Sequence, residues 1–136
     1  APVVTMIFDP QCQWCVWEFE QFRPFMDRVT FVWHPVAVLN PWSELQGAAI
    51  LAAKDPKATF MEHEKHFRDE AFKGLDVRKM TLPFEKREKV WDNSKIFRRA
   101  GGNSVPFGVL KTTDGRYVPI PQVTTADFAR LSGLKA

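Results

Sequence analysis

Cysteine is scarce in this chain of 136 residues: there are two, Cys12 and Cys15, separated by two residues. Cysteines at this spacing close a very small loop, so a disulfide between them constrains the unfolded chain little. The sequence therefore does not describe a domain that is held together by disulfide bonds. A single Cys-x-x-Cys pair also supplies only half of the ligands that a structural zinc site needs.

Long hydrophobic runs are also missing, and the excess of positive charge is small. No apolar stretch approaches the roughly 20 residues that cross a bilayer, so we expect no membrane insertion. The formal net charge is +3. Basic residues alternate with acidic ones, as in segment 84–89, which is typical of a solvated helix face rather than of a nucleic-acid groove. We therefore expect no nucleic-acid partner.

An initiator methionine is absent too, because the chain opens on Ala1-Pro2 and shows no signal-peptide pattern. We interpret it as a mature or trimmed sequence, so that any exporting signal or preceding domain would lie outside it. What is present is core material: 45% of the residues are apolar, including twelve Phe and five Trp, and 26% are charged. This length and composition predict one globular domain spanning residues 1–136.

The first third of the chain predicts a β-α-β arrangement. Residues Val3–Phe8 form a short apolar run rich in β-branched side chains, which is typical of a buried strand. After Cys12 the apolar residues recur at spacings of three and four, which predicts a helix with a kink or break near residues 21–24, where Pro24 lies. Residues 30–39 are again rich in β-formers, with an irregularity expected at Pro35.

A helical insertion over about residues 43–100 follows. We expect a helix over 43–54 with Ser43 as N-cap and Gln46 in a capping-box position. Asp55, followed by proline, predicts the start of a second helix that runs to about Phe72. A loop over 74–83 and a third helix over 84–100 complete the insertion, and the Gly pair at 101–102 ends that helix.

The remaining residues predict a β-β-α arrangement. Residues 105–110 read as a strand, and an Asp-Gly turn at 114–115 leads into a second arm over 117–120. Thr124 or Thr125 caps a last helix that Gly133 ends. The full order is β-α-β, helical insertion, β-β-α, which matches the thioredoxin fold, an α/β fold with a mixed central sheet and helices on both faces.

The Cys-x-x-Cys pair stands where this fold would give it reactivity. A helix N-terminus carries partial positive charge and unsatisfied N–H groups, so it stabilises a thiolate and lowers its pKa. The thiolate is the form that attacks disulfides. Its position makes Cys12 the nucleophile, and Cys15, one turn further along, the residue that resolves a mixed disulfide. The alternative is a structural or metal-binding pair.

Two further segments are candidates for substrate contact. Gln13 and Trp14 lie between the cysteines; Trp14 is either a platform for substrate or a ring folded onto its own helix. Val105 and Pro106 precede the predicted hairpin. A cis bond at Pro106 next to the cysteines would leave the backbone of Val105 to pair with an extended substrate, whereas a trans proline opening an edge strand is the simpler alternative.

A metal-binding module is the alternative from another class of function. Cys12 and Cys15 with His34 would need one more ligand, and His63 and His66 are the other histidines. Those two lie on a charged helical segment, where we expect them to be exposed to solvent rather than to bind metal. We expect His34 to be packed or to lie near the site. The sequence thus predicts no metal and no cofactor.

The residues also resemble a known family. Segment 8–15, Phe-Asp-Pro-Gln-Cys-Gln-Trp-Cys, resembles the bacterial periplasmic disulfide isomerases DsbC and DsbG, as do 34–37, His-Pro-Val-Ala, and the run from Gly102 through Val105-Pro106 to Pro119. The resemblance spans essentially the whole chain. It implies a periplasmic enzyme that shuffles or reduces disulfides in protein substrates with cysteines and that a redox partner resets, with Cys12 as the attacking thiol and Pro106 as a cis proline.

Two features depart from the family's pattern. Its members carry an N-terminal dimerisation domain, which this sequence does not contain, either because it was trimmed or because the protein lacks it. They also usually have Thr before the cis proline, where this chain has Val105, as in the oxidase DsbA. An oxidase of the DsbA type, and a thioredoxin-like protein used in assembly, therefore stay open as alternatives.

Overall fold

The structure is a computed structural model that describes residues 1–69 and 73–136. Its elements follow the expected order: β-α-β, then three helices, then β-β-α. The chain divides into two compact units. The first consists of Ala1–Phe8, Trp14–His34 and Ser104–Ala136, and the second of Asp9–Gln13 and Pro35–Asn103. The second unit contains the predicted helical insertion.

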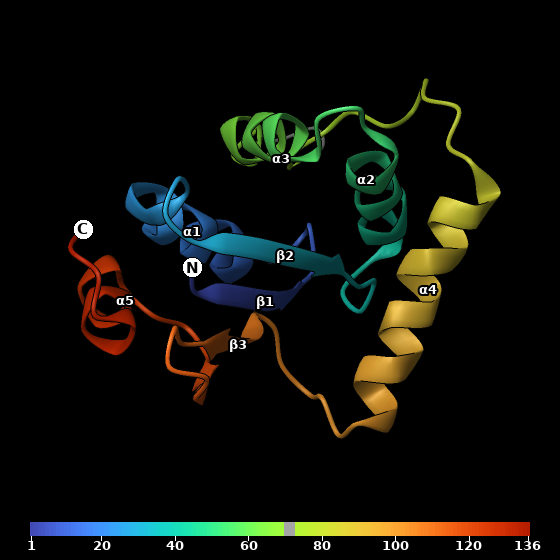
Figure 1. The fold of residues 1–136 in the computed structure, drawn as a ribbon. Coiled ribbons are helices and arrows are strands. Elements are labelled where there is room, and N and C mark those ends of the chain that lie inside the picture. Colours follow the sequence, from blue (N-terminus) through green and yellow to red (C-terminus); the bar gives the residue numbers. More distant parts are fainter. Residues whose placement is uncertain (70–72) are drawn as a thin grey trace. The chain divides into compact units, whose positions relative to one another are not determined.

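The first unit is built on a four-stranded sheet in the order β2-β1-β3-β4. The strands are β1 (Val3–Phe8), β2 (Thr30–Pro35), β3 (Phe107–Lys111) and β4 (Tyr117–Ile120). β3 is antiparallel to both β1 and β4, whereas β1 and β2 run in the same direction (Figure 1). The sheet is therefore mixed, as expected.

The register of β1 and β3 brings the loop before β3 to the end of β1. Ile7 lies opposite Phe107, and Val3 lies opposite Lys111. The strand that the sequence predicts over 105–110 begins two residues later than expected, at Phe107. Pro106 has no N–H to donate to the sheet, which is consistent with a strand that starts after it.

Aromatic rings fill the core of the first unit. Helix α1 (Gln13–Phe22) is followed by a short 3-10 helix, η1 (Arg23–Phe25), so the break expected near Pro24 is confirmed. Helix α5 (Thr125–Ser132) brings Phe128 to 5.1 Å from Phe22, ring centre to ring centre. Strands and helices together bury one apolar cluster: Val4, Met6, Phe22, Phe25, Val29, Leu110, Ile120, Val123 and Phe128.

Turn and cap signals near the C-terminus are confirmed. Gly115 has a φ of 87°, which the Asp-Gly turn between β3 and β4 requires. Of the two candidate caps, Thr124 is the N-cap of α5, in a capping box with Asp127. Gly133 ends α5 with a φ of 77°, in the left-handed conformation that glycine adopts at helix ends.

The second unit contains α2 (Pro41–Ala52), α3 (Pro56–Lys65) and α4 (Phe84–Arg99). α2 packs against both other helices. A Cβ at Gly47 of α2 would lie 3.1 Å from a methyl group of Val90 on α4. Glycine thus permits the close approach of α2 to α4.

The predicted limits of two helices are wrong. α2 starts at Pro41, and its N-cap is Asn40, not Ser43, which is the third helical residue and completes the capping box. Proline fits the first helical position because no N–H is needed there. α3 ends at Lys65 instead of about Phe72, a residue that lies outside the described part of the chain. The N-cap at Asp55 is confirmed.

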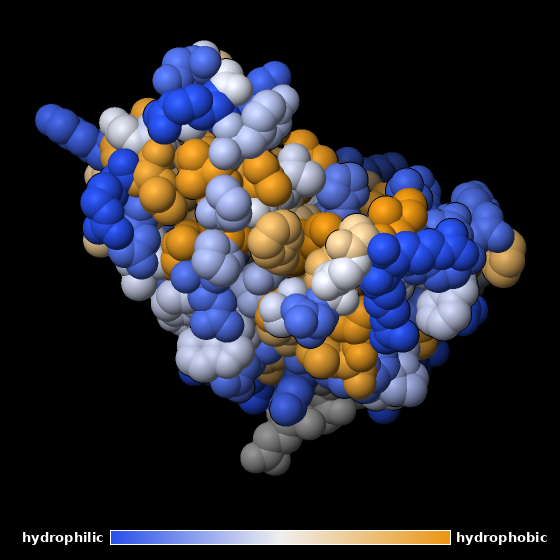
Figure 2. Space-filling model, turned by 90° about the horizontal axis from the view of Figure 1, so that it is seen from below, coloured by the Kyte–Doolittle hydropathy of each residue, from blue (hydrophilic) through white to orange (hydrophobic). Residues whose placement is uncertain are grey.

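The surface keeps several large apolar side chains exposed. Hydrophobic and hydrophilic residues are intermixed on the face shown in Figure 2, so hydrophilic side chains interrupt the apolar area. Within the described residues, no helix is long and apolar enough to cross a membrane. Among the large apolar side chains that the structure describes, the most exposed are Phe84, Tyr117, Ile96, Trp91 and Leu39.

Candidate active site

The two cysteines stand at the start of α1. Residues Asp9–Cys12 form a tight turn in which the N–H of Cys12 donates to the carbonyl of Asp9 at 2.9 Å. Cys12 directly precedes the helix, and Cys15 is its third residue. Cys12 keeps 7% of its surface exposed and Cys15 keeps 1%. The first turn of α1 contains no acidic side chain that would oppose a thiolate there.

A buried carboxylate fixes the turn that leads to Cys12. The side chain of Asp9 has no exposed surface. Its Oδ1 accepts from the N–H of Gln11 at 2.8 Å. Its Oδ2 accepts from the N–H groups of Val38 and Leu39 at 2.8 and 3.0 Å. A carboxylate that accepts several backbone N–H bonds is stable without solvent, so Asp9 ties the turn to the loop after β2.

The side chain of Gln11, next to Cys12, is held by three other segments. Its Nε2 donates to Oε1 of Gln46 at 2.6 Å and to the carbonyl of Lys73 at 2.9 Å. Its Oε1 accepts from Nδ2 of Asn40 at 3.1 Å. Because Gln46 is itself buried in α2, the amide of Gln11 connects the turn to the helical insertion.

His63 holds the remaining residue of the turn. Its side chain has no exposed surface, so the expectation that His63 faces solvent is wrong. Its Nε2 lies 2.6 Å from the carbonyl oxygen of Pro10, and its Nδ1 accepts from the N–H of Leu75 at 3.1 Å. Burial lowers the pKa of His63, an effect that the bond to Pro10 and the charge of Asp9 oppose.

His66 lies on the surface, as expected. Its two ring nitrogens each lie 2.8 Å from a carboxylate oxygen, of Asp69 and Glu62. These hydrogen bonds, first that to Asp69, raise the pKa of His66. His34 is partly buried in β2. Within residues 1–69 and 73–136, no three His, Cys, Asp or Glu side chains are grouped so that they could hold a metal ion.

The residues between the cysteines begin α1. Gln13 is exposed, and Trp14 is 48% exposed. The ring of Trp14 also packs edge-on against Trp17, three residues further along, with ring centres 5.8 Å apart. Trp14 thus leans on its own helix and keeps about half of its surface for other contacts. This placement agrees with both interpretations of Trp14, a platform for substrate and a ring folded onto its own helix.

Glu18, on α1, is a second buried carboxylate. It is 1% exposed, and its Oε2 accepts from the N–H of Val123 at 2.7 Å. This contact joins α1 to the segment that leads into α5. Glu18 follows Cys15 by three residues, so the two side chains share one side of the helix.

The peptide bond between Val105 and Pro106 is cis, as expected. The two residues precede β3, and the pairing of Phe107 with Ile7 puts this loop at the end of β1. β1 is the strand from which the chain continues to the turn before Cys12.

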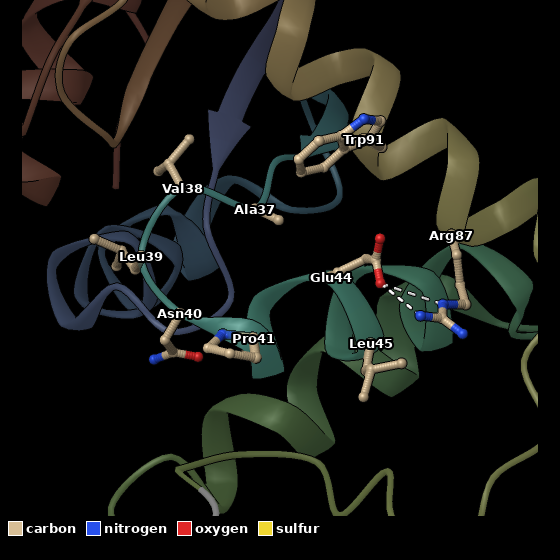
Figure 3. Close-up of a pocket in the computed structure, with 9 residues that line it drawn as sticks. All are labelled: Ala37, Val38, Leu39, Asn40, Pro41, Glu44, Leu45, Arg87 and Trp91. Carbon is tan, nitrogen blue, oxygen red and sulfur yellow. Dashed lines mark hydrogen bonds and ion pairs between the residues drawn. The ribbon is translucent and has the colours of Figure 1, made fainter.

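The loop that Asp9 binds also lines a pocket of about 490 Å³ in the second unit (Figure 3). One wall is the loop after β2, and the other walls come from α2 and α4, with Trp91 projecting from α4. An ion pair between Glu44 and Arg87, 2.9 Å apart, lies at its polar side. The lining residues are Ala37, Val38, Leu39, Asn40, Pro41, Glu44, Leu45, Arg87 and Trp91.

Sequence reasoning finds the cysteines and the proline loop but misses the residues that hold the turn. The sequence assigns no role to Asp9, and it predicts that His63 is exposed to solvent. A weak signal existed for Asp9, because Asp before Pro favours a turn in which the side chain accepts backbone N–H groups. No local signal identifies His63, whose partner Pro10 lies 53 residues away.

Comparison with known proteins shows relatives with disulfide chemistry. The thiol:disulfide interchange protein DsbG of Pseudomonas aeruginosa is 29% identical over 119 residues, which are 85% of this chain and 45% of that protein. DsbG of Escherichia coli is 34% identical over 113 residues, 78% of this chain and 42% of that protein. The chain thus spans less than half the length of the curated relatives it matches. No protein-family model matches it.

The fold has solved counterparts. A periplasmic thioredoxin-like protein from Salmonella enterica serovar Typhimurium superposes with a TM-score of 0.75 at 16% identity, over 97% of this chain and 82% of that one. The chain therefore has the thioredoxin fold that its order of elements predicts. In sequence it is similar to the thiol:disulfide interchange protein DsbG, and in fold to a thioredoxin-like protein.

Proposed function

We propose that this chain is the catalytic part of a thiol–disulfide oxidoreductase that acts through Cys12 and Cys15. The observation that carries the proposal is the position of the pair: Cys12 directly before α1 and Cys15 within its first turn, in a thioredoxin fold. The helix N-terminus stabilises a thiolate at Cys12. The nearly complete burial of Cys15 suits a residue that reacts only with its neighbour.

Reduction of a substrate proceeds in two exchanges. The Cys12 thiolate attacks one sulfur of the substrate disulfide, forming a mixed disulfide and releasing the other substrate sulfur as a thiolate that takes up a proton. The Cys15 thiol then loses its proton and attacks the Cys12 sulfur. The second substrate thiol leaves, and a Cys12–Cys15 disulfide takes its place, so two electrons pass to the substrate. In isomerisation, a substrate thiolate attacks the mixed disulfide instead, and no net electrons are transferred.

The proposed contacts with substrate come from Gln13, Trp14, Val105 and Pro106. Trp14 supports this role through its half-exposed ring at the start of α1. Val105 and Pro106 are supported by the register that places their loop at the end of β1. An extended substrate that pairs with the backbone of Val105 would be bound without recognition of its side chains, which suits clients of many sequences.

The substrates we propose are exported proteins with cysteines, and the compartment is the periplasm. Support comes from the relatives, which are named thiol:disulfide interchange proteins, and from a solved neighbour described as periplasmic. An oxidising compartment supplies the disulfides on which such an enzyme acts. A separate redox partner would return the Cys12–Cys15 pair to the dithiol after each reduction.

Two assays on one sample test the proposal: reduction of insulin by dithiothreitol, and recovery of activity by scrambled ribonuclease. We expect the chain to accelerate at least the first, and Cys12→Ser to abolish the effect in both. Recovery of ribonuclease activity without net reduction would assign isomerisation. A chain that accelerates neither reaction, while Cys12→Ser behaves identically, would contradict the proposal.

Oxidation of dithiols, as by DsbA, is the second candidate. It is favoured by one residue: Val105, which stands before Pro106 where the isomerases usually have Thr. Equilibration of the Cys12–Cys15 pair with glutathione buffers measures the reduction potential. A value near that of a strong oxidant, about −120 mV, would favour the oxidase, and one near about −270 mV a reductase. The metal-binding alternative has less support, because His63 is engaged by Pro10 and Leu75.

A further inference from the structure

The turn before Cys12 belongs to the second unit. Each of its other three residues is hydrogen-bonded to another segment of that unit. Asp9 is bound by the loop after β2 and Gln11 by α2 and the loop before Leu75. Pro10, between them, is contacted by His63 of α3. Proline has no N–H, so its carbonyl oxygen is the polar backbone atom through which the middle of the turn can be held.

The hydrogen bonds determine which nitrogen of His63 carries the proton. The N–H of Leu75 can only donate, so Nδ1 of His63 must accept and is unprotonated. In the neutral ring the proton then sits on Nε2, which donates to the carbonyl of Pro10 at 2.6 Å. A doubly protonated ring would set two donors against each other at Leu75. The site therefore requires one tautomer of the neutral imidazole.

The ring is also enclosed so that it keeps this orientation. Phe60 and Phe67 flank the imidazole edge-on, with ring centres 6.4 and 5.9 Å away. Gly74 passes over the ring with a φ of 116°, and any Cβ at that position would overlap the imidazole. Aromatic packing and a glycine thus leave His63 a fixed slot beside Pro10.

We propose that His63 is a positioning residue for Cys12: its Nε2–H, by holding the Pro10 carbonyl, fixes the turn that presents the Cys12 sulfur at the start of α1. This inference deepens the proposed function and rests on it. When the bond is lost, Pro10 and Gln11 can move, and Cys12 leaves the position in which the helix N-terminus stabilises its thiolate. The reactivity of Cys12 then shifts toward that of an ordinary cysteine.

Two substitutions separate the two hydrogen bonds of His63. In His63→Gln, the amide nitrogen reaches the place of Nε2, so the donor to Pro10 is kept and the acceptor for Leu75 is lost. In His63→Asn, the shorter side chain places its oxygen near Nδ1, so the acceptor for Leu75 is kept and the bond to Pro10 is lost. Each variant loses one buried bond, so the two form a matched pair for stability.

The measurement is the rate of alkylation of reduced Cys12 by iodoacetamide between pH 4 and 10, in a Cys15→Ser background. We expect His63→Asn to raise the pH of half-maximal rate by about half a unit or more, and His63→Gln to stay close to the parent. Equal shifts in both variants would reduce His63 to a structural role and overturn the proposal, as would no shift in either. If Cys12 of the unaltered protein already shows the pH dependence of an ordinary cysteine, the proposed function fails instead.

A second measurement covers the case in which the variants do not fold. Long-range ¹H–¹⁵N spectra of the unaltered chain, labelled at histidine, distinguish the two neutral tautomers. We expect His63 to carry its proton on Nε2 at neutral pH. A proton on Nδ1 would remove the donor to Pro10 and overturn the proposal.

Discussion

At the scale of single residues, the turn before Cys12 is held by an acidic side chain that solvent does not reach. Asp9 is fully buried, and three backbone N–H groups compensate it: one from its own turn and two from the loop after β2. Such a carboxylate stabilises the fold only if its oxygens accept enough hydrogen bonds, because an unpaired buried group costs its full desolvation energy. The same three bonds therefore hold the turn and make it sensitive to substitution.

Replacing Asp9 by Asn tests this dependence. The amide keeps the shape but turns an NH₂ group toward a backbone N–H, so we expect the free energy of unfolding to fall by about 2 kcal/mol. Urea denaturation measures it. Asp55→Asn is the control, because Asn and Asp are comparable N-caps and the change should stay within about 0.5 kcal/mol. Equal losses in both variants would show that the bonds of Asp9 carry no special weight.

The two cysteines should differ in reactivity. Cys12 precedes α1 and is 7% exposed, whereas Cys15 lies inside the helix and is 1% exposed. We expect limiting iodoacetamide to modify Cys12 several times faster than Cys15. Peptide mapping by mass spectrometry locates the adduct. If most of the label appears on Cys15, the roles of nucleophile and resolving residue must be exchanged.

Removing the nucleophile should leave the fold in place. A disulfide that spans so few residues adds little constraint to the unfolded chain, so Cys12→Ser should change the midpoint of thermal unfolding by only a few degrees. Circular dichroism through a thermal ramp measures this. An unfolded Cys12→Ser protein would point to a structural role for the pair instead.

At the scale of elements, helix caps connect local structure with the site. Asn40 is the N-cap of α2, accepting from the N–H of Trp42 at 2.9 Å, and it also donates to Gln11 next to Cys12. Thr124 caps α5 in a similar box but contacts only its own helix end in the hydrogen bonds described for it. The two caps therefore stabilise their own helices in the same way, but Asn40 also contacts the residue next to Cys12.

Alanine at each of these caps should separate stability from reactivity. We expect Asn40→Ala and Thr124→Ala each to lower the free energy of unfolding by about 1 kcal/mol. Only Asn40→Ala should also change the rate of Cys12 alkylation, because it frees the side chain of Gln11 on one side. A change in alkylation with Thr124→Ala of the same size would mean that general loosening, not the contact to Gln11, sets the rate.

Elements also show what the sequence can and cannot predict. The limits of β1 and β4 and the cap at Asp55 follow from local chemistry: β-branched runs, an Asp-Gly turn and an Asp-Pro start. The start of α2 does not follow from the sequence, because Asn40 and Ser43 both have capping side chains and only the backbone conformation decides between them. His63 could not be assigned, because its burial depends on Pro10 and Gly74, which only the tertiary fold brings to it.

At the scale of the whole molecule, two histidines give stability opposite dependences on pH. The pKa of His63 is lowered on folding, so the unfolded chain binds more protons just below pH 6.5, and stability falls as the pH drops from 6.5 toward the folded pKa. The pKa of His66 is raised, so its contribution is present below pH 6.5 and is lost as the pH rises through its folded pKa.

Unfolding by urea from pH 5 to 8 tests both effects. We expect the parent to lose stability relative to His63→Gln as the pH falls below 6.5, because the variant has no buried imidazole to protonate. His66→Gln is the counterpart: the parent's advantage over it should be largest at low pH and shrink as the pH rises. Parallel curves for the parent and His63→Gln would show that the buried ring does not titrate with unfolding.

The strand order has a consequence for a protein whose proposed substrates bind as extended chains. β2 and β4 are the outer strands of the sheet, and an exposed outer strand can recruit any extended chain into a growing aggregate. β4 is only four residues long and contains Pro119, which faces Val109 of β3, and β2 stops at Pro35. A proline cannot donate to a neighbouring strand. β4, which is short and interrupted by proline, is thereby a poor template, so extended clients are less able to accumulate along it as insoluble deposits.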